Sequence, residues 1–324
     1  MTEKKSFLSS GLGMVGRNKR YIVWFWLLNL TLAEFGTSGF RGSAHAILDH
    51  SFYADRLLHG FSLSVVFELL ARPEFGSFDA VRVPALFFAF LFFLATALFL
   101  PGVFQGYAST YRLPREDFFC ACGRNLWRFV RLMIVSGIVM GGVAAIGFGT
   151  WGALVKKAGD STNELLPFRV QMACLGVIFL VMTTLRIWFD LAEADIVLDD
   201  QRAVRKSIWR AFLHTFKGLG SLLGSYVVAT IVAAIILAGG VCVWIKFVPS
   251  DSVIGAFIVA QVVLFLLLIP RFWQRGVAVS YWQQRMMMPG VSALPMISRV
   301  APTPEVQPPP SAPVPGAPPA TGEA

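Results

Sequence analysis

Long runs of uncharged, mostly hydrophobic residues alternate with short polar segments along this chain. Five runs contain no Asp, Glu, Lys or Arg: 83–111, 132–155, 170–185, 218–245 and 252–270. A sixth run, 21–40, contains a single carboxylate, Glu34. Because a helix rises about 1.5 Å per residue, most of these runs can cross a hydrocarbon core of roughly 30 Å. The pattern predicts an all-α polytopic membrane protein, with six transmembrane helices in a membrane domain at 21–290.

The composition supports this interpretation and argues against two other classes of protein. Of the 324 residues, 56% are hydrophobic and only 15% are charged. Soluble domains carry about 25% charged residues. The longest polar segments are too short to enclose an independent hydrophobic core. A soluble enzyme and a single-pass receptor are therefore both disfavoured.

The positive charges are distributed unevenly about the predicted spans. With six spans, 20 of the 28 Lys and Arg residues fall on the side of the N-terminus and eight fall on the other side. Cytoplasmic loops carry such an excess, so the imbalance predicts a cytoplasmic segment at 1–20 and both termini in the cytoplasm. Topology accounts for the net charge of +9, so the charge implies no nucleic-acid partner.

Three segments outside the spans are predicted to form amphipathic helices. In the segment 51–72, one helical stripe is apolar: Leu58, Phe61, Val65 and Leu69. This stripe predicts a helix on the outer face that either lies in the membrane interface or caps the spans. Segments 115–130 and 201–216 are expected to be interfacial helices on the cytoplasmic side.

The segment 291–324 is expected to be a disordered cytoplasmic tail. Ten prolines lie between residues 295 and 320, mostly among small and polar residues. Proline lacks the backbone N–H that helices and sheets need, so this stretch cannot form a packed core. An alternative role for the prolines is docking into an aromatic groove of a partner in polyproline conformation.

Two of the cytoplasmic segments enter the following span in a similar way. Trp127–Arg128 precedes one span and Trp209–Arg210 precedes another. Indole rings prefer the level of the lipid head groups and arginine prefers the phosphates, so both pairs are predicted interface anchors. Small residues then follow at a spacing of four, which predicts close helix contacts at Gly137, Gly141, Gly220 and Gly224. A duplicated unit of interfacial helix and span explains the similarity, and a chance match is the alternative.

These residues also carry a resemblance to a known family. The run Arg186–Ile–Trp–Phe–Asp–Leu–Ala–Glu–Ala–Asp–Ile–Val–Leu–Asp–Asp200, the segment 203–210 and the closing Val277–Ala–Val–Ser–Tyr–Trp–Gln–Gln–Arg285 resemble the membrane domain of glycerophosphodiester phosphodiesterases and related six-span bacterial proteins. The resemblance covers roughly residues 120–285. The phosphodiesterase barrel does not occur in the sequence. The resemblance therefore implies an architecture and a bacterial inner (cytoplasmic) membrane, and it does not carry over the enzyme.

Three charged residues are candidates for an intramembrane polar site. Glu34 follows thirteen uncharged residues, about 20 Å into the membrane, and serves either in proton or cation handling or as a structural carboxylate near the outer interface. Arg186 and Asp190 are four residues apart, so they face each other on one helix and can neutralise each other. The acidic residues that follow could instead attract a cation or a basic partner, and Asp199 and Asp200 suit the positive N-terminal end of the next helix.

No residue pattern in the sequence predicts catalysis, a cofactor or a metal. The sequence has no His-Glu-x-x-His, no Gly-x-Ser-x-Gly and no phosphate-binding Gly-x-x-x-x-Gly-Lys. Three histidines, His45, His50 and His59, do not align on one helix face. Cys120 and Cys122 have no second cysteine pair with which to hold zinc.

The leading functional hypothesis is a non-enzymatic membrane protein that serves as a scaffold or accessory subunit of a membrane assembly. The scarcity of charge within the spans favours it, because coupled transporters retain several buried ionisable groups. The alternative is a transporter or channel for a small solute or lipid that uses Glu34 and the Arg186/Asp190 region. An enzyme that acts on lipid is a third hypothesis, without a nucleophile or acid–base pair to name. The partners expected are the lipid bilayer and either another membrane protein or a second copy of the chain.

The predicted topology can be tested by cysteine labelling. In a variant without its native cysteines, single cysteines at positions 118 and 320 should react only with reagents that reach the cytoplasm. Labelling of either position from the outer side alone would contradict six spans with cytoplasmic termini.

Overall fold

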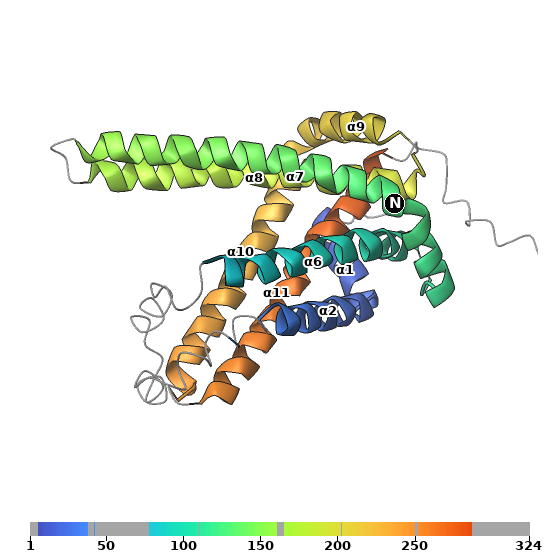
Figure 1. Ribbon diagram of the computed structural model, residues 1–324. Helices are drawn as coiled ribbons and strands as arrows, with labels where there is room; N and C mark the ends of the chain where they lie inside the picture. Colours follow the sequence, from blue (N-terminus) through green and yellow to red (C-terminus); the bar gives the residue numbers. More distant parts are fainter. Residues whose placement is uncertain are drawn as a thin grey trace, which may run out of the picture. The chain divides into compact units, whose positions relative to one another are not determined.

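The computed structural model describes residues 6–37, 42, 78–109, 111–160, 165–201, 203–249 and 252–286, and for 78–85 and 253 the backbone alone. Every element within these residues is a helix, which confirms the all-α class for this part of the chain (Figure 1). In chain order they are α1 (Phe7–Arg17), α2 (Arg20–Gly36), α6 (Phe78–Ala108), α7 (Arg115–Gly159), α8 (Leu166–Leu198), α9 (Val204–Lys217), α10 (Leu219–Phe247), α11 (Val253–Tyr281) and the π-helical turn η2 (Trp282–Met286).

Five of the six predicted runs form helices that are long and apolar enough to cross a membrane. These stretches are Leu86–Ala108, Arg115–Gly159, Leu166–Leu198, Leu219–Phe247 and Ile254–Met286. The sixth run begins in α2, whose 17 residues extend about 26 Å. Residues 38–41 of that run lie outside the described residues. The chain is therefore a helical membrane-embedded protein with five candidate spans, and the sixth span stays a prediction.

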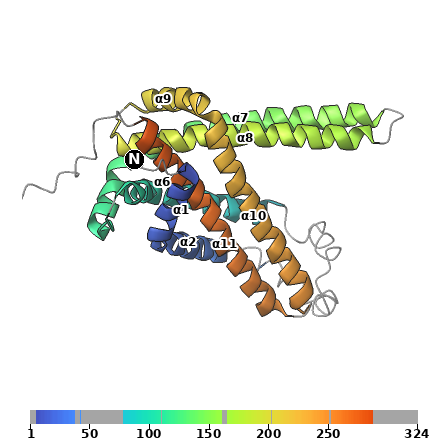
Figure 2. The same ribbon diagram turned by 180° about the vertical axis from the view of Figure 1, so that it is seen from behind.

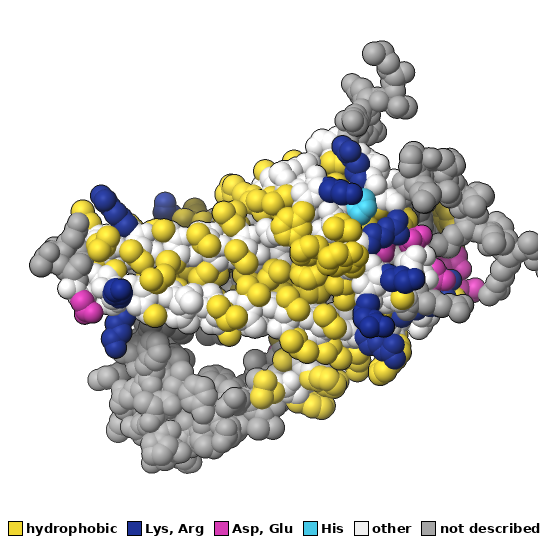
Figure 3. All heavy atoms as spheres, turned by 90° about the horizontal axis from the view of Figure 1, so that it is seen from above, with side chains coloured by type: hydrophobic (Ala, Val, Ile, Leu, Met, Phe, Trp, Pro, Cys, Tyr) yellow, Lys and Arg dark blue, Asp and Glu magenta, His cyan; other side chains and the backbone are white. Residues whose placement is uncertain are grey.

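The middle parts of the long helices expose their apolar side chains. Ile138 and Ile146 of α7 are 70% and 69% exposed, and Ile235 of α10 is 65% exposed. A soluble protein would bury such side chains, whereas hydrocarbon solvates them. Figure 3 shows the same pattern on one face, where Lys and Arg gather at the two ends of the α7–α8 pair with a hydrophobic band between them. This distribution fits helices that are surrounded by lipid.

The packed core lies toward one end of the helices. Its buried side chains include Phe25 of α2, Phe104 of α6, Phe129 of α7, Ile187 of α8 and Phe272 of α11. The rings of Phe104 and Phe129 lie 6.2 Å apart, and those of Phe25 and Phe272 lie 5.1 Å apart. Core residues come from the N-terminal parts of α2, α7 and α10 and from the C-terminal parts of α6, α8 and α11. Helices that cross a membrane back and forth would place these ends on one side, as the predicted topology requires.

The N-terminal segment, predicted as part of a cytoplasmic stretch at 1–20, forms a helix that packs along the end of α11 (Figure 2). The ring centroids of Phe7 and Tyr281 lie 5.4 Å apart. The indole Nε1 of Trp273 donates a hydrogen bond to the backbone oxygen of Leu8 at 2.8 Å. The beginning of α1 and the end of α11 are thus neighbours. This proximity supports the prediction that both ends of the membrane domain lie on one side.

The predicted surface helices differ in how the structure presents them. The segment 201–216 corresponds to the separate helix α9. The segment 115–130 is also helical, but it is the first part of α7, which continues without a break for 45 residues. Phe118 is buried within it, so the neighbouring Phe119, which is exposed, is the better position for the labelling experiment. The predicted outer helix at 51–72 and the tail at 291–324 lie outside the described residues.

The close helix contacts predicted at four glycines are absent within the described part of the chain. No atom lies within 4 Å of the position that a Cβ would take at any of them: Gly137, Gly141, Gly220 and Gly224. Two other glycines, Gly11 of α1 and Gly276 of α11, mark a crossing where backbone meets backbone. A Cβ on Gly276 would lie 2.7 Å from the backbone oxygen of Gly11. Spacing alone did not indicate which face of a helix meets a neighbour.

Replacement of Gly276 by leucine should therefore destabilise the protein. The new side chain meets the backbone of α1, which cannot move aside cheaply, so the free energy of unfolding should fall by about 1–3 kcal/mol. Thermal unfolding in detergent measures the effect. Gly224→Leu is the matched control, and its melting temperature should equal that of the unchanged protein. Equal destabilisation by both substitutions would contradict the observed crossing.

Candidate functional site

The C-terminal part of α8 carries the acidic side chains that organise the polar core. Asp190 accepts a hydrogen bond from the hydroxyl of Tyr226 on α10 at 2.8 Å, and the Nε atom of Arg186 lies 3.8 Å from the same carboxylate oxygen. The ion pair predicted from the spacing of Arg186 and Asp190 is therefore confirmed. Gln274 of α11 joins this region through a hydrogen bond to the hydroxyl of Thr230 at 3.2 Å.

Farther along α8, Asp195 is fully buried and links three elements. Its Oδ1 atom lies 3.2 Å from the Nη1 atom of Arg210 on α9. The same oxygen accepts a hydrogen bond of 3.2 Å from the indole Nε1 of Trp282 in η2. A buried carboxylate is costly without such partners. Asp195 therefore fixes α9 and η2 against the end of α8.

The last two acidic residues bind the arginines of the two predicted anchors. Asp199 lies 2.6 Å from Arg210, and Asp200 lies 2.6 Å from Arg128 of α7. The N-cap residue of α9 is Ala203, and no side chain caps the helix. The acidic pair thus forms ion pairs with arginines of α9 and α7 in place of the predicted helix-end role. The acidic run is occupied by the chain's own cations.

Two arginines of α11, Arg271 and Arg275, approach the acidic end of α8. They are one helical turn apart, and both interact electrostatically with Glu193 of α8. Arg271 also interacts with Arg186 and Asp190. Three guanidinium groups thus face at most two carboxylates. Among the described residues, at least one positive charge in this cluster has no carboxylate to balance it.

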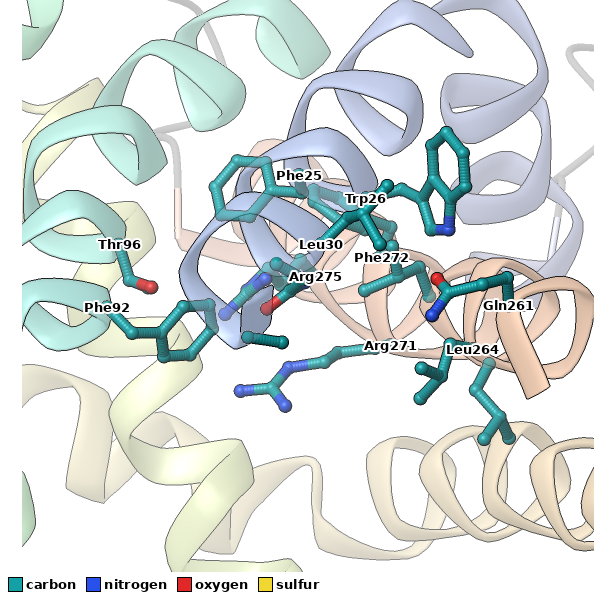
Figure 4. Close-up of a pocket in the computed structure, with 14 residues that line it drawn as sticks. Phe25, Trp26, Leu30, Phe92, Thr96, Gln261, Leu264, Arg271, Phe272 and Arg275 are labelled. Carbon is teal, nitrogen blue, oxygen red and sulfur yellow. The ribbon is translucent and has the colours of Figure 1, made fainter. Parts of the chain in front are cut away.

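These two arginines line a cavity of about 430 Å³ between α2, α6 and α11 (Figure 4). The remaining lining residues are mostly apolar or aromatic: Phe25, Trp26, Asn29, Leu30, Ala33, Phe92, Thr96, Gln261, Leu264, Leu267, Leu268 and Phe272. Arg271 is exposed toward this space, whereas Arg275 is only 6% exposed. The cavity therefore combines a cationic end with hydrophobic walls.

Several polar atoms of the lining residues lack a partner among the described residues. They are Oγ1 of Thr96, Nε1 of Trp26 and Nε of Arg275, and all three are buried. Each can donate a hydrogen bond. Leaving a buried donor unpaired costs about 1–3 kcal/mol. A ligand with negative charge would complement the two arginines that line the cavity, whereas a cation would not.

The structure includes only part of the predicted site in this region. Arg186 and Asp190 belong to the charged cluster. Glu34 is exposed on α2 and does not line the cavity, although the adjacent Ala33 does. The sequence contained a signal for the missed residues, because Arg271 and Arg275 follow the uncharged run 252–270 at a spacing of four. Positive charges beside a span also fix membrane topology, so the spacing by itself does not indicate a binding site.

Comparisons of the chain with family models, with curated proteins and with solved structures gave no match. The resemblance to the membrane domain of glycerophosphodiester phosphodiesterases is therefore untested.

Substitution of Asp190 should lower the stability of the protein, whereas substitution of Glu34 should not. Asp190→Leu leaves the buried hydroxyl of Tyr226 without its acceptor, so stability should fall by about 1–3 kcal/mol. Glu34→Gln should leave the melting temperature unchanged, because Glu34 is exposed at the far end of α2 from the core. Thermal unfolding of the two variants in the same detergent checks both expectations. A large loss of stability in Glu34→Gln would show that this carboxylate supports the fold.

Proposed function

We propose that this chain is a non-enzymatic polytopic membrane protein that binds an anionic amphiphile, a lipid head group with its first acyl carbons, in the arginine-lined cavity. The observation that carries the proposal is the excess of positive charge that Arg271 and Arg275 bring to an otherwise mostly hydrophobic cavity. Arginine recognises phosphate and carboxylate oxygens through paired N–H donors. The cavity walls suit an acyl chain.

The shape and depth of the cavity favour an amphiphile over a free solute. Phe92 and Leu264 belong to helix parts whose other faces are exposed to lipid, so the hydrophobic part of the cavity borders the bilayer. Arg271 comes directly after the uncharged run 252–270, which places its guanidinium near the end of the hydrocarbon layer. Lipid phosphates lie at that level.

The lining supports binding and offers little for catalysis. Among the described residues, no carboxylate, histidine or cysteine lines the cavity. Such groups supply the nucleophiles and general acids of most enzymes. The two arginines can hold and orient an anion, and Asn29 and Gln261 can add hydrogen bonds. This arrangement favours the alternative hypothesis of a protein that interacts with lipid. Arg271 and Arg275, and not Glu34, would be the charged residues that bind the ligand.

The setting that we propose follows from the sequence. The resemblance implies a bacterial inner membrane, and the charge imbalance places both termini in the cytoplasm. The contact of α1 with the end of α11 supports termini on one side. Arg271 and Arg275 then lie near the cytoplasmic leaflet. A chain that binds lipid there could act as an accessory subunit, which keeps the scaffold hypothesis compatible with the cavity.

Binding of a detergent-soluble short-chain phosphatidylglycerol tests the proposal. Arg271→Gln should weaken binding at least roughly tenfold, because a hydrogen bond to a charged group contributes about 1.5–3 kcal/mol. Arg285→Gln is the matched control, since Arg285 is exposed on η2 and does not line the cavity. Native mass spectrometry or a thermal-shift titration gives the dissociation constants.

Two further measurements separate a lipid from a free anion. Leu264→Trp fills the hydrophobic part of the cavity, so it should weaken lipid binding while inorganic phosphate binds as before. A phosphatidylcholine of equal chain length should bind more weakly than phosphatidylglycerol. Equal dissociation constants of Arg271→Gln and Arg285→Gln for phosphatidylglycerol would contradict a binding site at Arg271. Loss of lipid and phosphate binding together in Leu264→Trp would reject the amphiphile.

A further inference from the structure

Two tryptophans outside the cavity are among the most exposed large side chains of the described residues. Trp127 of α7 is 64% exposed and Trp209 of α9 is 63% exposed. Helix α9 turns its small residues inward: Ser207, Ala211 and Thr215 are buried. Its large residues Leu213 and Phe216 are exposed beside Trp209. Because the side of α9 with small residues packs against α8, the side with large hydrophobic residues is exposed.

The charged side chains of α9, and those of the part of α7 around Trp127, are all basic. Helix α9 contains four Lys and Arg residues and no acidic residue. On α7, the stretch 119–131 contains three arginines and no acidic residue. The guanidinium of Arg131 lies 5.1 Å from the ring centroid of Trp127. Burial lowers the pKa of His214, so its imidazole is neutral at pH 7 and adds no charge to this face.

The acidic end of α8 ties together the parts of α7 and α9 that carry the two tryptophans. Each tryptophan is followed by an arginine, and these arginines bind neighbouring residues: Arg128 binds Asp200, and Arg210 binds Asp199. The indole Nε1 of Trp188 also donates to the backbone oxygen of Ile208 at 2.8 Å, which holds α9 on α8. The exposed residues Trp127, Arg131, Trp209, Leu213 and Phe216 are together called the Trp127–Trp209 surface below.

Both helices lead directly into hydrocarbon-spanning segments. Trp127 lies five residues before the uncharged run 132–155, about 8 Å along the helix. Trp209 lies nine residues before the run 218–245. Figure 3 looks onto the face that carries α9, where hydrophobic side chains are flanked by Lys and Arg. The surface is therefore placed at the level of lipid head groups, where indole rings and arginines are stabilised.

We propose that the Trp127–Trp209 surface docks into the head-group layer of an anionic lipid leaflet and selects anionic over zwitterionic lipid. The aromatic and aliphatic side chains enter the boundary with the acyl chains, and the surrounding cations face the phosphates. The Asp199–Asp200 pair neutralises Arg128 and Arg210 and ties α7 and α9 to the end of α8. This site is separate from the cavity, and it does not depend on the proposed ligand of Arg271.

Fluorescence quenching in nanodiscs tests the proposal on the full chain. The probes are phosphatidylglycerol and phosphatidylcholine that carry bromine atoms on acyl carbons near the glycerol. Tryptophan quenching by brominated phosphatidylglycerol should exceed that by brominated phosphatidylcholine by roughly twofold at equal mole fraction. The difference should shrink with added salt, because the attraction is electrostatic. Because Trp26 lines the cavity, the comparison is made in a Trp26→Phe background, in which Trp127→Phe/Trp209→Phe should abolish the difference.

Two charge variants separate the surface from general attraction to the membrane. Arg205→Gln/Lys206→Gln/Lys217→Gln should remove at least half of the difference between the lipids, since these exposed residues flank the surface. Lys156→Gln/Lys157→Gln is the control, at the opposite end of α7, and should change nothing. Equal quenching by the two lipids, or a difference that persists without Trp127 and Trp209, would overturn the proposal. If neither Trp127 nor Trp209 contributes to the quenching by brominated lipid, the surface does not contact lipid, which would also overturn the proposal.

Discussion

The rest of this structure depends on the cost of unpaired carboxylates at the end of α8. Burial in a low-dielectric core makes Asp190 and Asp195 expensive unless a cation or donor faces them, whereas Asp199 and Asp200 are more exposed. The required partners come from different helices: Tyr226 from α10, Arg210 from α9, Arg128 from α7 and Trp282 from η2. One short acidic stretch thereby fixes four elements around α8. Lipid-facing helices share little apolar surface that could position them, because hydrocarbon solvates their side chains as well as a protein neighbour does.

This constraint also explains why the cavity is cationic. The carboxylates of α8 are engaged mainly by cations outside the cavity, which leaves Arg271 and Arg275 with an incomplete set of counter-charges. Buried Arg275 keeps its Nε donor without a partner in the described part of the chain. An arginine so close to hydrocarbon is tolerated only with partners, water or a ligand. A deficit of acceptors on the protein side is thus the physical basis for expecting an anion.

The sequence predicted features that depend on local pattern and missed features that depend on which faces meet. Uncharged runs predicted the long helices, and the spacing of Arg186 and Asp190 predicted their ion pair. No described helix packs on the four predicted glycines, because a stripe of small residues suits a helix neighbour and lipid equally well, so a contact there stays a prediction. The change from polar to apolar residues after position 131 predicts that the interfacial helix ends before the span begins. The segment 115–159 contains no proline, and it forms one continuous helix. The cavity requires α2, α6 and α11 to converge, and no local pattern encodes that convergence.

The two proposed lipid contacts are held at related depths by α8. Glu193 faces the arginines of the cavity, and Asp199 holds Arg210 beside Trp209. Six residues separate these two acidic side chains, which corresponds to about 9 Å along the helix. The polar regions add about 5–8 Å on each side of the hydrocarbon core, so two levels about 9 Å apart place the deeper one, at Glu193, at the edge of the hydrocarbon and the other in the head-group layer. A lipid at the Trp127–Trp209 surface and a head group in the cavity would therefore belong to the same leaflet. The acidic end of α8 is the element that keeps these two levels within one leaflet.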